Sequence, residues 1–232
     1  MRRDMLEPMK GKCSMPDIPK HAVIFCHPRR DSFNGAVVDA YCAAIEEIGH
    51  EVCLRDLYRM NFDPVLKDEE RPGEPGFRLH ADVEEELRVM AGASVFVLVY
   101  PIWFGTPPAM LKGYVERVFG SGFSHRDMRE EHRNRLLSGA HLLSLTSSGN
   151  TKNWLDEQAQ WLSLRDVFDH YLKTIFSMQS DEHVHFAPIN DQSPSRFIEE
   201  NLEQVRAAAR IVAAKAASDT HRRQTGKLKL RP

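Results

Sequence analysis

One segment of the chain has the composition of an anion-binding turn. It is His27-Pro-Arg-Arg-Asp-Ser-Phe-Asn34, and it leads directly into an expected helix. A helix N-terminus offers free N–H groups and a partial positive charge, so Ser32 and Asn34 could donate to phosphate oxygens there while His27 adds charge. The alternative is that Ser32 only caps the helix and Asn34 only occupies its first turn. The segment by itself leaves both interpretations open.

A second segment carries two adjacent aromatic side chains in a turn. It is Tyr100-Pro-Ile-Trp-Phe-Gly105, and it follows the most apolar run of the chain. Exposed rings need an apolar partner, and a flat conjugated ligand would supply one to Trp103 and Phe104. Packing beneath a loop is the alternative, because it is the commoner arrangement of aromatic side chains.

Two further groups of residues could bind a metal or a nucleic acid. His183 and His185 alternate on an expected strand, so they point to one face of it and could form a metal triad with His170. No acidic or cysteine partner stands at ligand spacing, and we therefore expect polar residues at a strand end and no metal. The basic residues from His221 to Arg231 lack aromatic neighbours, which favours a solvated terminus over a nucleic-acid-binding arm.

Short apolar runs alternate with helical patterns along the chain. The runs predict strands over residues 21–26, 50–54, 94–100, 141–146 and 183–187. Apolar residues at helical spacing predict helices over residues 33–49, around Val83 to Met90, and over 107–119, 154–176 and 194–217. Residues 60–66 and 71–77 are expected to form a long surface loop.

This alternation predicts a three-layer α/β fold with a doubly wound, flavodoxin-like sheet of five parallel strands. Each right-handed crossover between parallel strands needs a helix, and the helices bury both faces of the sheet. In such sheets ligands lie beyond the carboxyl ends of the strands, where the winding reverses. Three loops therefore become candidates for a site: 27–34, 101–106 and 146–151.

Composition and charge indicate one soluble domain. The chain has 232 residues, and 31 basic residues nearly balance 33 acidic ones, so no global field favours nucleic acid or an anionic membrane. Its four cysteines form no C-x-x-C pair, and no apolar run is long enough for a signal peptide or a membrane span, so we expect reduced thiols and a cytoplasmic protein. We expect a flexible leader over residues 1–20, a domain over 21–217 and a disordered basic tail over 218–232.

Three ordered segments resemble the NAD(P)H:quinone oxidoreductase family of flavodoxin-like proteins. They are His27 with Ser32-Phe-Asn34, Asp56-Leu-Tyr58 with Met60 to Pro64, and the run from Tyr100 to Phe119. The resemblance covers about residues 20–150. It implies a flavin, FMN or FAD, with NAD(P)H as co-substrate, ping-pong hydride transfer through flavin N5 to a quinone-like small molecule, and a homodimer with flavin sites at the subunit interface.

The resemblance also implies roles for single residues. The phosphate and ribityl end of the flavin would be held by His27, Ser32, Phe33 and Asn34. The ring would be lined by Pro101, Ile102, Trp103 and Phe104. The third loop is similar to a Thr-Thr-Gly-Gly loop whose amides face the pyrimidine side of the flavin, and its residues are Thr146, Ser147, Ser148 and Gly149. Such N–H donors stabilise negative charge on a reduced flavin.

The acceptor side of the expected site is less complete. The resemblance aligns Phe123, Ser124 and His125 with a segment that walls the acceptor pocket. A neutral His125 imidazole could protonate a quinone oxygen, and a surface-loop histidine is the alternative. Eukaryotic members have a Tyr and a His just after the third loop, but residues 150–156 offer no obvious counterpart, so either another residue substitutes or the acceptor chemistry differs.

A different class of function is compatible with the same motifs. The chain could be a flavin-bound regulatory or electron-transfer partner with little turnover of its own, as some relatives of this family are for potassium-efflux systems. A dedicated carrier usually needs an acidic docking face, and the near-neutral composition of this chain does not indicate one. Turnover of NAD(P)H with a quinone separates the two classes.

Overall fold

Five parallel strands form the centre of the molecule. They are β1 (Lys20–Phe25), β2 (Glu51–Asp56), β3 (Val95–Pro101), β4 (His141–Ser147) and β5 (Ser180–Phe186). Their order in the sheet is β2-β1-β3-β4-β5, so the winding reverses between β1 and β3. The computed structural model describes residues 18–130 and 132–229, with side chains as far as residue 222. The predicted doubly wound, flavodoxin-like sheet is confirmed.

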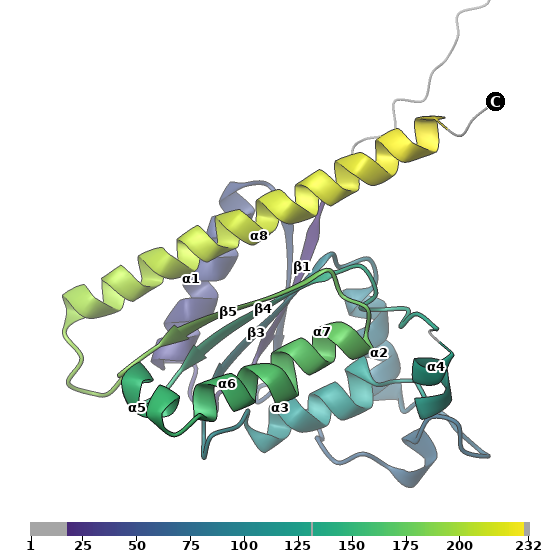
Figure 1. Ribbon diagram of the computed structural model, residues 1–232, viewed down its shortest axis with the longest axis horizontal. Coiled ribbons are helices and arrows are strands. Elements are labelled where there is room, and N and C mark those ends of the chain that lie inside the picture. The colour runs from purple at the N-terminus through teal and green to yellow at the C-terminus, as the bar shows by residue number, and fades with distance from the viewer. Residues whose placement is uncertain (1–17, 131, 230–232) are drawn as a thin grey trace, which may run out of the picture.

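Helices cover both faces of this sheet (Figure 1). One face is covered by α1 (Phe33–Glu47) and α8 (Ser195–Lys229). The other face is covered by α2 (Ala81–Met90), α3 (Ala109–Tyr114), the π-helical η2 (Val115–Phe119), α6 (Gln160–Leu164), the π-helical η3 (Arg165–His170) and α7 (Tyr171–Ile175). Short helices in the connections are η1 (Asp68–Glu70), α4 (His125–Arg129) and α5 (Lys152–Glu157).

Alternation along the central strands divides the apolar core between these two layers. Phe96 and Leu98 pack toward α2, η2 and α7, whereas Val97 and Val99 pack toward α1 and α8. All seven residues of β3 are buried, because helices cover the strand on both faces. The continuous apolar run that predicted this strand is the consequence of that double coverage.

The C-terminal helix is longer than the sequence predicts. We expected disorder from residue 218, but α8 continues to Lys229. The reason within the described side chains is a contact to the sheet: the Asp219 carboxylate lies 3.0 Å from Nε2 of His141 on β4. The expected leader lies outside the described residues up to residue 17.

Two local details also differ from the sequence prediction. Strand β5 begins at Ser180 rather than residue 183, since its first residues are polar and carry no apolar signal. The predicted helix over residues 154–176 is broken near Ala159, whose φ of 55° lies in the left-handed region.

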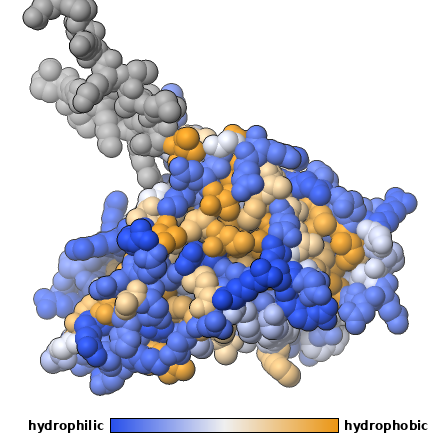
Figure 2. Space-filling model, turned by 180° about the vertical axis from the view of Figure 1, so that it is seen from behind, coloured by the Kyte–Doolittle hydropathy of each residue, from blue (hydrophilic) through white to orange (hydrophobic). Residues whose placement is uncertain are grey.

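The surface is mainly hydrophilic on the side opposite to the view of Figure 1, with apolar residues gathered in patches near its middle (Figure 2). No helix in residues 18–130 and 132–229 is long and apolar enough to cross a bilayer. Three cysteines in this part of the chain, Cys26, Cys42 and Cys53, are free thiols, and Cys13 lies outside it.

Candidate functional site

The three loops selected from the sequence meet at the carboxyl edge of the sheet, where they and residues from the segment 189–198 line a cleft of about 530 Å³. This volume lies in the range of small-molecule sites. Ten of the twelve predicted cofactor residues line it: His27, Ser32, Phe33, Asn34, Pro101, Ile102, Trp103, Ser147, Ser148 and Gly149. Phe104 lines an adjoining hollow of about 440 Å³, which shares Ile102, Ser148 and Gly149 with the cleft. Thr146 lines neither hollow.

The first turn of α1 forms one end of the cleft. Ser32 is its N-cap, and Ser32 Oγ accepts from the Gly35 N–H at 3.2 Å. The Phe33 and Asn34 amides precede the first intrahelical bond and are oriented out of the helix N-terminus, where an anion binds. The capping role and the anion-binding role of this turn are therefore compatible, although the sequence posed them as alternatives.

Asn34 has a second role that the sequence did not indicate. Its Oδ1 accepts from the Ser147 hydroxyl at 2.6 Å, and Asn34 is only 3% exposed. This bond joins the first turn of α1 to the end of β4. The end of the cleft that suits a phosphate is thus tied directly to the loop expected to face a ring.

Gly35 is a site residue that the sequence analysis missed. A Cβ at this position would lie 1.9 Å from the Arg30 carbonyl oxygen, so only glycine permits the turn to fold this closely over α1. Arg30 also donates to the Gly35 carbonyl at 2.8 Å and pairs with Asp39, whereas the exposed Arg29 pairs with Asp31. The Asn-Gly sequence at the start of a helix was the available signal.

The aromatic turn projects from the sheet edge. Trp103 and Thr106 exchange two backbone hydrogen bonds of 3.1 Å, and the residues between them, Phe104 and Gly105, have φ values of 50° and 80°. These values fit a type I′ turn, which is unfavourable for a bulky residue such as Phe104. The Phe104 side chain is fully exposed, and the Trp103 ring lies 5.9 Å from the His27 ring. A strained, exposed aromatic residue of this kind makes the turn a candidate for ligand or partner contact.

The free amides of the third loop lie later in the chain than the resemblance implies. Thr146 and Ser147 belong to β4, and the Ser148 N–H donates to the Phe186 carbonyl at 3.2 Å. Among the described residues, no hydrogen-bond acceptor is paired with the N–H groups of Gly149 and Asn150. The donors available to a ligand are therefore those of Gly149 and Asn150.

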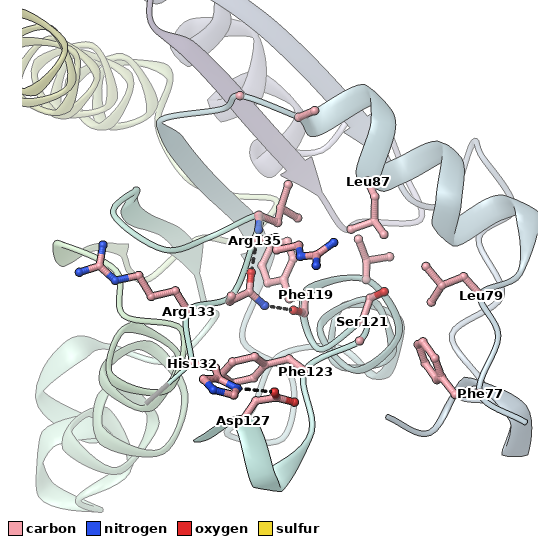
Figure 3. Close-up of a pocket in the computed structure, with 16 residues that line it drawn as sticks. Phe77, Leu79, Leu87, Phe119, Ser121, Phe123, Asp127, His132, Arg133 and Arg135 are labelled. Carbon is pink, nitrogen blue, oxygen red and sulfur yellow. Dashed lines mark hydrogen bonds and ion pairs between the residues drawn. The ribbon is translucent and has the colours of Figure 1, made fainter. Parts of the chain in front are cut away.

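The three predicted acceptor-wall residues lie away from the cleft of their own chain. Phe123 lines a separate hollow of about 860 Å³ with Phe119 and Leu87 (Figure 3). Ser124 caps α4 and pairs with Asp127, and His125 is the exposed first residue of that helix. None of the three lines either hollow at the carboxyl edge of the sheet.

A polar cluster behind the third loop was also missed. Thr146 Oγ1 lies 2.6 Å from His183 Nε2 and 2.9 Å from His185 Nδ1. The Asp169 carboxylate lies 2.5 Å from His183 Nδ1 and is the acidic partner that sequence spacing did not reveal. His170 is instead exposed and pairs with Asp181 at 3.4 Å, so the considered histidine triad does not form.

Burial keeps one imidazole of this cluster neutral. Removal from water, helped by the nearby His183 and Lys152, lowers the pKa of His185 to about 4. At neutral pH His185 therefore has one N–H and one free ring nitrogen. It can accept one hydrogen bond while it donates another.

Comparisons with known proteins agree with this geometry. A family model described as flavodoxin-like fold matches residues 19–212. An uncharacterized NAD(P)H oxidoreductase of Haemophilus influenzae is 37% identical over 107 residues, which are 46% of this chain and 53% of the relative. The chain thus spans about half the length of that relative. The Escherichia coli NAD(P)H oxidoreductase YcaK, also uncharacterized, is 30% identical over 154 residues, which are 62% of this chain and 79% of YcaK.

A solved structure supports the same conclusion. The NAD(P)H:quinone oxidoreductase from Methanothermobacter marburgensis superposes with a TM-score of 0.71 and 28% identity, covering 83% of this chain and 95% of that one. The family model, the sheet order and this superposition agree over nearly all of the domain. The chain belongs to the flavodoxin-like fold family.

Proposed function

We propose that the chain is a flavin-dependent NAD(P)H:acceptor oxidoreductase that reduces a quinone-like small molecule. The observation that carries the proposal is that three different recognition elements line one cleft at the point where the winding reverses. They are the N-terminus of α1, the ring of Trp103 and the unpaired N–H of Gly149. The similarity to NAD(P)H oxidoreductases and to a quinone oxidoreductase supports the same reaction class.

The residues of the cleft fit the parts of a flavin in order. The amides of Phe33 and Asn34 would hold the phosphate, because a helix N-terminus binds anions without a buried cation. Trp103 would contact the ring, and the amides of Gly149 and Asn150 would donate to its electron-rich edge. When bound, the flavin accepts a hydride from NAD(P)H and passes it to the acceptor. The balanced reaction is NAD(P)H + H⁺ + quinone → NAD(P)⁺ + hydroquinone.

The proposal includes a homodimer. Large apolar side chains are exposed along α6, η3 and α7: Leu162 is 63% exposed, Val167 70% and Tyr171 52%. Burial of each such side chain against a second copy would contribute about 1.5 to 3 kcal/mol. A second copy could also bring its own segment 123–125 to this cleft, which accounts for the distance of those residues from the cleft within one chain.

The dimer is tested by charge substitutions on this surface. The double variant Leu162→Glu, Val167→Glu should elute as a monomer in size-exclusion chromatography, whereas the unaltered chain should elute as a dimer. A monomeric unaltered chain would contradict the assembly.

We also propose a cytoplasmic location, supported by the free thiols Cys26, Cys42 and Cys53 and testable by cell fractionation.

The reaction is tested on the purified protein. Flavin absorbance, release of the chromophore and its identification as FMN or FAD come first. Steady-state oxidation of NADH and NADPH with a benzoquinone follows, and parallel double-reciprocal lines are expected for a ping-pong reaction. Full flavin loading without turnover would favour the alternative, a regulatory or electron-transfer partner protein. A protein that takes up neither FMN nor FAD would refute both functions.

A glycine substitution links this test to the cleft. Gly35→Ala forces the Arg30 carbonyl away from the first turn of α1, so flavin affinity should fall by at least about tenfold. Gly113→Ala is the control, because a Cβ at Gly113 would lie 2.1 Å from the Pro64 carbonyl oxygen, a comparable clash at a residue that lines neither hollow at the sheet edge. Equal flavin affinity in the two variants would argue against the assigned phosphate end.

A further inference from the structure

A continuous chain of hydrogen bonds leads from the lip of the cleft into the protein interior. Ser148, which lines both hollows at the sheet edge, has its Oγ 3.0 Å from His185 Nε2. His185 Nδ1 lies 2.9 Å from Thr146 Oγ1, and Thr146 Oγ1 lies 2.6 Å from His183 Nε2. His183 Nδ1 lies 2.5 Å from Asp169 Oδ2. All four separations lie within hydrogen-bonding distance.

We propose that this chain, from Ser148 through His185, Thr146 and His183 to Asp169, is a proton relay that supplies the acceptor during its reduction. The inference rests on the proposed function, because the balanced reaction consumes one proton besides the hydride. It also answers the question left by residues 150–156, which contain neither a tyrosine nor a histidine.

The hydrogen bonds of the relay can all point in either of two directions. In the first, Ser148 donates to His185 Nε2, His185 Nδ1–H donates to Thr146, Thr146 donates to His183 Nε2, and His183 Nδ1–H donates to Asp169. In the second, every bond between Ser148 and His183 is reversed. The Ser148 hydroxyl then donates to the Asn150 carbonyl, which lies 2.9 Å away.

These two directions differ by one proton. In the reversed state His183 carries N–H on both ring nitrogens and faces the Asp169 carboxylate as an imidazolium, whereas in the first state both imidazoles are neutral. A proton can thus enter or leave at Ser148 while the charge appears or disappears at His183. Each intervening hydroxyl or imidazole passes one proton on and receives another, the His185 ring at opposite nitrogens.

The inner end of this hydrogen-bond chain is enclosed by protein. The side chains of His183 and Asp169 are 0% and 1% exposed, and Asp169 also accepts from the Ser144 hydroxyl at 2.6 Å. The Trp161 ring lies 4.6 Å from the His183 ring and 5.2 Å from the His185 ring, so it shields both imidazoles from water.

The charged groups around the relay have opposite effects on a positive charge at His185 and at His183. Lys152, whose ammonium lies 5.5 Å from the Trp161 ring, disfavours a charge on His185, as does His183 itself. Arg165 lines a hollow together with His183, and Asp169 is the anion in direct contact with that ring. Asp169 also faces the Tyr100 phenol on β3. The imidazole in direct contact with a carboxylate is thus His183, and the imidazole on which the nearby charges disfavour a proton is His185.

The proposed step balances in atoms and charge. As the acceptor receives its hydride, the Ser148 hydroxyl proton forms a bond to the acceptor's anionic oxygen and the Ser148 oxygen takes the Nε2 proton of His185. His185 Nδ1 takes the Thr146 proton, and Thr146 takes the Nε2 proton of His183. His183 becomes neutral, and the relay takes up one proton from water before the next reaction cycle.

Thr146 offers a matched pair of variants for the test. Thr146→Val keeps the shape but removes the only hydroxyl between the imidazoles, whereas Thr146→Ser keeps that hydroxyl. In stopped-flow experiments on the flavin-loaded protein, Thr146→Val should slow quinone reduction by about a hundredfold, the lower end of what general acid catalysis contributes. Flavin reduction by NAD(P)H should change by less than about twofold, since it needs no proton from this side. Thr146→Ser should retain the solvent deuterium isotope effect of the unaltered protein on quinone reduction, and Thr146→Val should lose it.

A second variant guards against a merely structural effect. Ser148→Ala removes the outer end of the relay and leaves the bonds from His185 through Thr146 and His183 to Asp169 in place, so it should reproduce the slow quinone step. Equal slowing of both half-reactions in Thr146→Val and Ser148→Ala, with an unchanged isotope effect, would overturn the relay.

A measurement without flavin separates the relay from the proposed function. In ¹⁵N NMR spectra of the flavin-free protein, the ring nitrogens of His183 and His185 should respond together during a pH titration, because protonation of one reverses the bonds of the other. In Thr146→Val the two responses should become independent, and in Thr146→Ser they should stay joined. Independent responses in the unaltered protein would refute the relay, whereas joined responses in a protein without quinone turnover would refute only the proposed function.

Discussion

Two buried polar clusters of this molecule are built on different principles, one among helices and the other between strands β4 and β5 and η3. In the first, the Arg117 side chain is 1% exposed and donates to Glu70 at 2.7 and 2.8 Å and to Asp82 at 2.7 and 3.0 Å. In the second, hydroxyls and imidazoles alternate between Ser148 and Asp169. One cluster holds fixed charges, and the other can shift a proton.

The two clusters also differ in whether their groups can gain or lose a proton. Burial alone would raise the pKa of Glu70, but hydrogen bonds from Arg117 outweigh it and lower that pKa. Guanidinium and carboxylate therefore stay ionised, and every bond in the first cluster has one permanent direction. The imidazoles and hydroxyls of the second cluster can each donate or accept. A buried ion pair thus fixes η2 against α2 and η1, whereas a buried imidazole chain suits proton transfer.

Removal of the fixed charge should have the largest effect on stability. Arg117→Met leaves Glu70 buried without its cation and should lower the free energy of unfolding by about 3 to 5 kcal/mol, measured by urea denaturation. Arg88→Met is the control, because Arg88 and Glu85 form an exposed pair whose loss should change it by less than about 1 kcal/mol. Similar losses in both variants would remove the distinction between a buried and a surface pair.

The second cluster should respond to pH instead. The pKa of His185 is about 4 in the folded protein and near 6.5 in the unfolded chain, so the unfolded state binds the proton first as the pH falls. The unaltered protein should therefore lose about 2 kcal/mol of stability between pH 7 and pH 5 through this residue, and His185→Gln should not. His125→Gln, at an exposed histidine, should behave like the unaltered protein in the same urea titrations. A loss that persists in His185→Gln would assign the acid sensitivity to other groups.

A smaller effect on stability is expected at Asp169, the inner end of the relay. Ser144→Ala removes a 2.6 Å hydrogen bond to the buried Asp169 carboxylate and should lower the unfolding free energy by about 1 to 2 kcal/mol. Ser163→Ala removes a bond of 2.7 Å from an exposed hydroxyl to the Ala159 carbonyl, and it should change stability by less than about 0.5 kcal/mol. Thermal unfolding followed by circular dichroism ranks the two, and an inverted order would show that Asp169 does not depend on this donor.

The smallest effect should have the opposite sign. Phe104→Asn places a residue that tolerates positive φ in the aromatic turn and should raise the unfolding free energy by about 0.5 to 1 kcal/mol. Because the exposed ring is lost, affinity for flavin or quinone should fall in fluorescence titrations. A variant that is more stable and binds equally well would indicate that Phe104 has no role at the cleft.

Much of the fold and the cleft could be predicted from the sequence, because both depend on local patterns. Apolar runs with turn residues located the strands, and the carboxyl-end rule then selected the loops that contain Ser32, Trp103 and Ser148. The relay depends instead on contacts between residues distant in sequence. Asp169 is 14 positions from His183, and Thr146 is 37 positions from it. The alternation of His183 and His185 indicated a shared face, but spacing alone cannot supply partners from a neighbouring strand and helix.

The hydrogen bond between Ser147 and Asn34 has a consequence for affinity. It holds the two walls of the cleft at a fixed separation within the protein alone, so an incoming planar molecule need not order either loop. Ordering one flexible side chain at an interface costs about 0.5 to 1.5 kcal/mol, and a preorganised slot avoids that expense. Tight retention of a ligand through many turnovers would follow from this rigidity rather than from a large number of contacts.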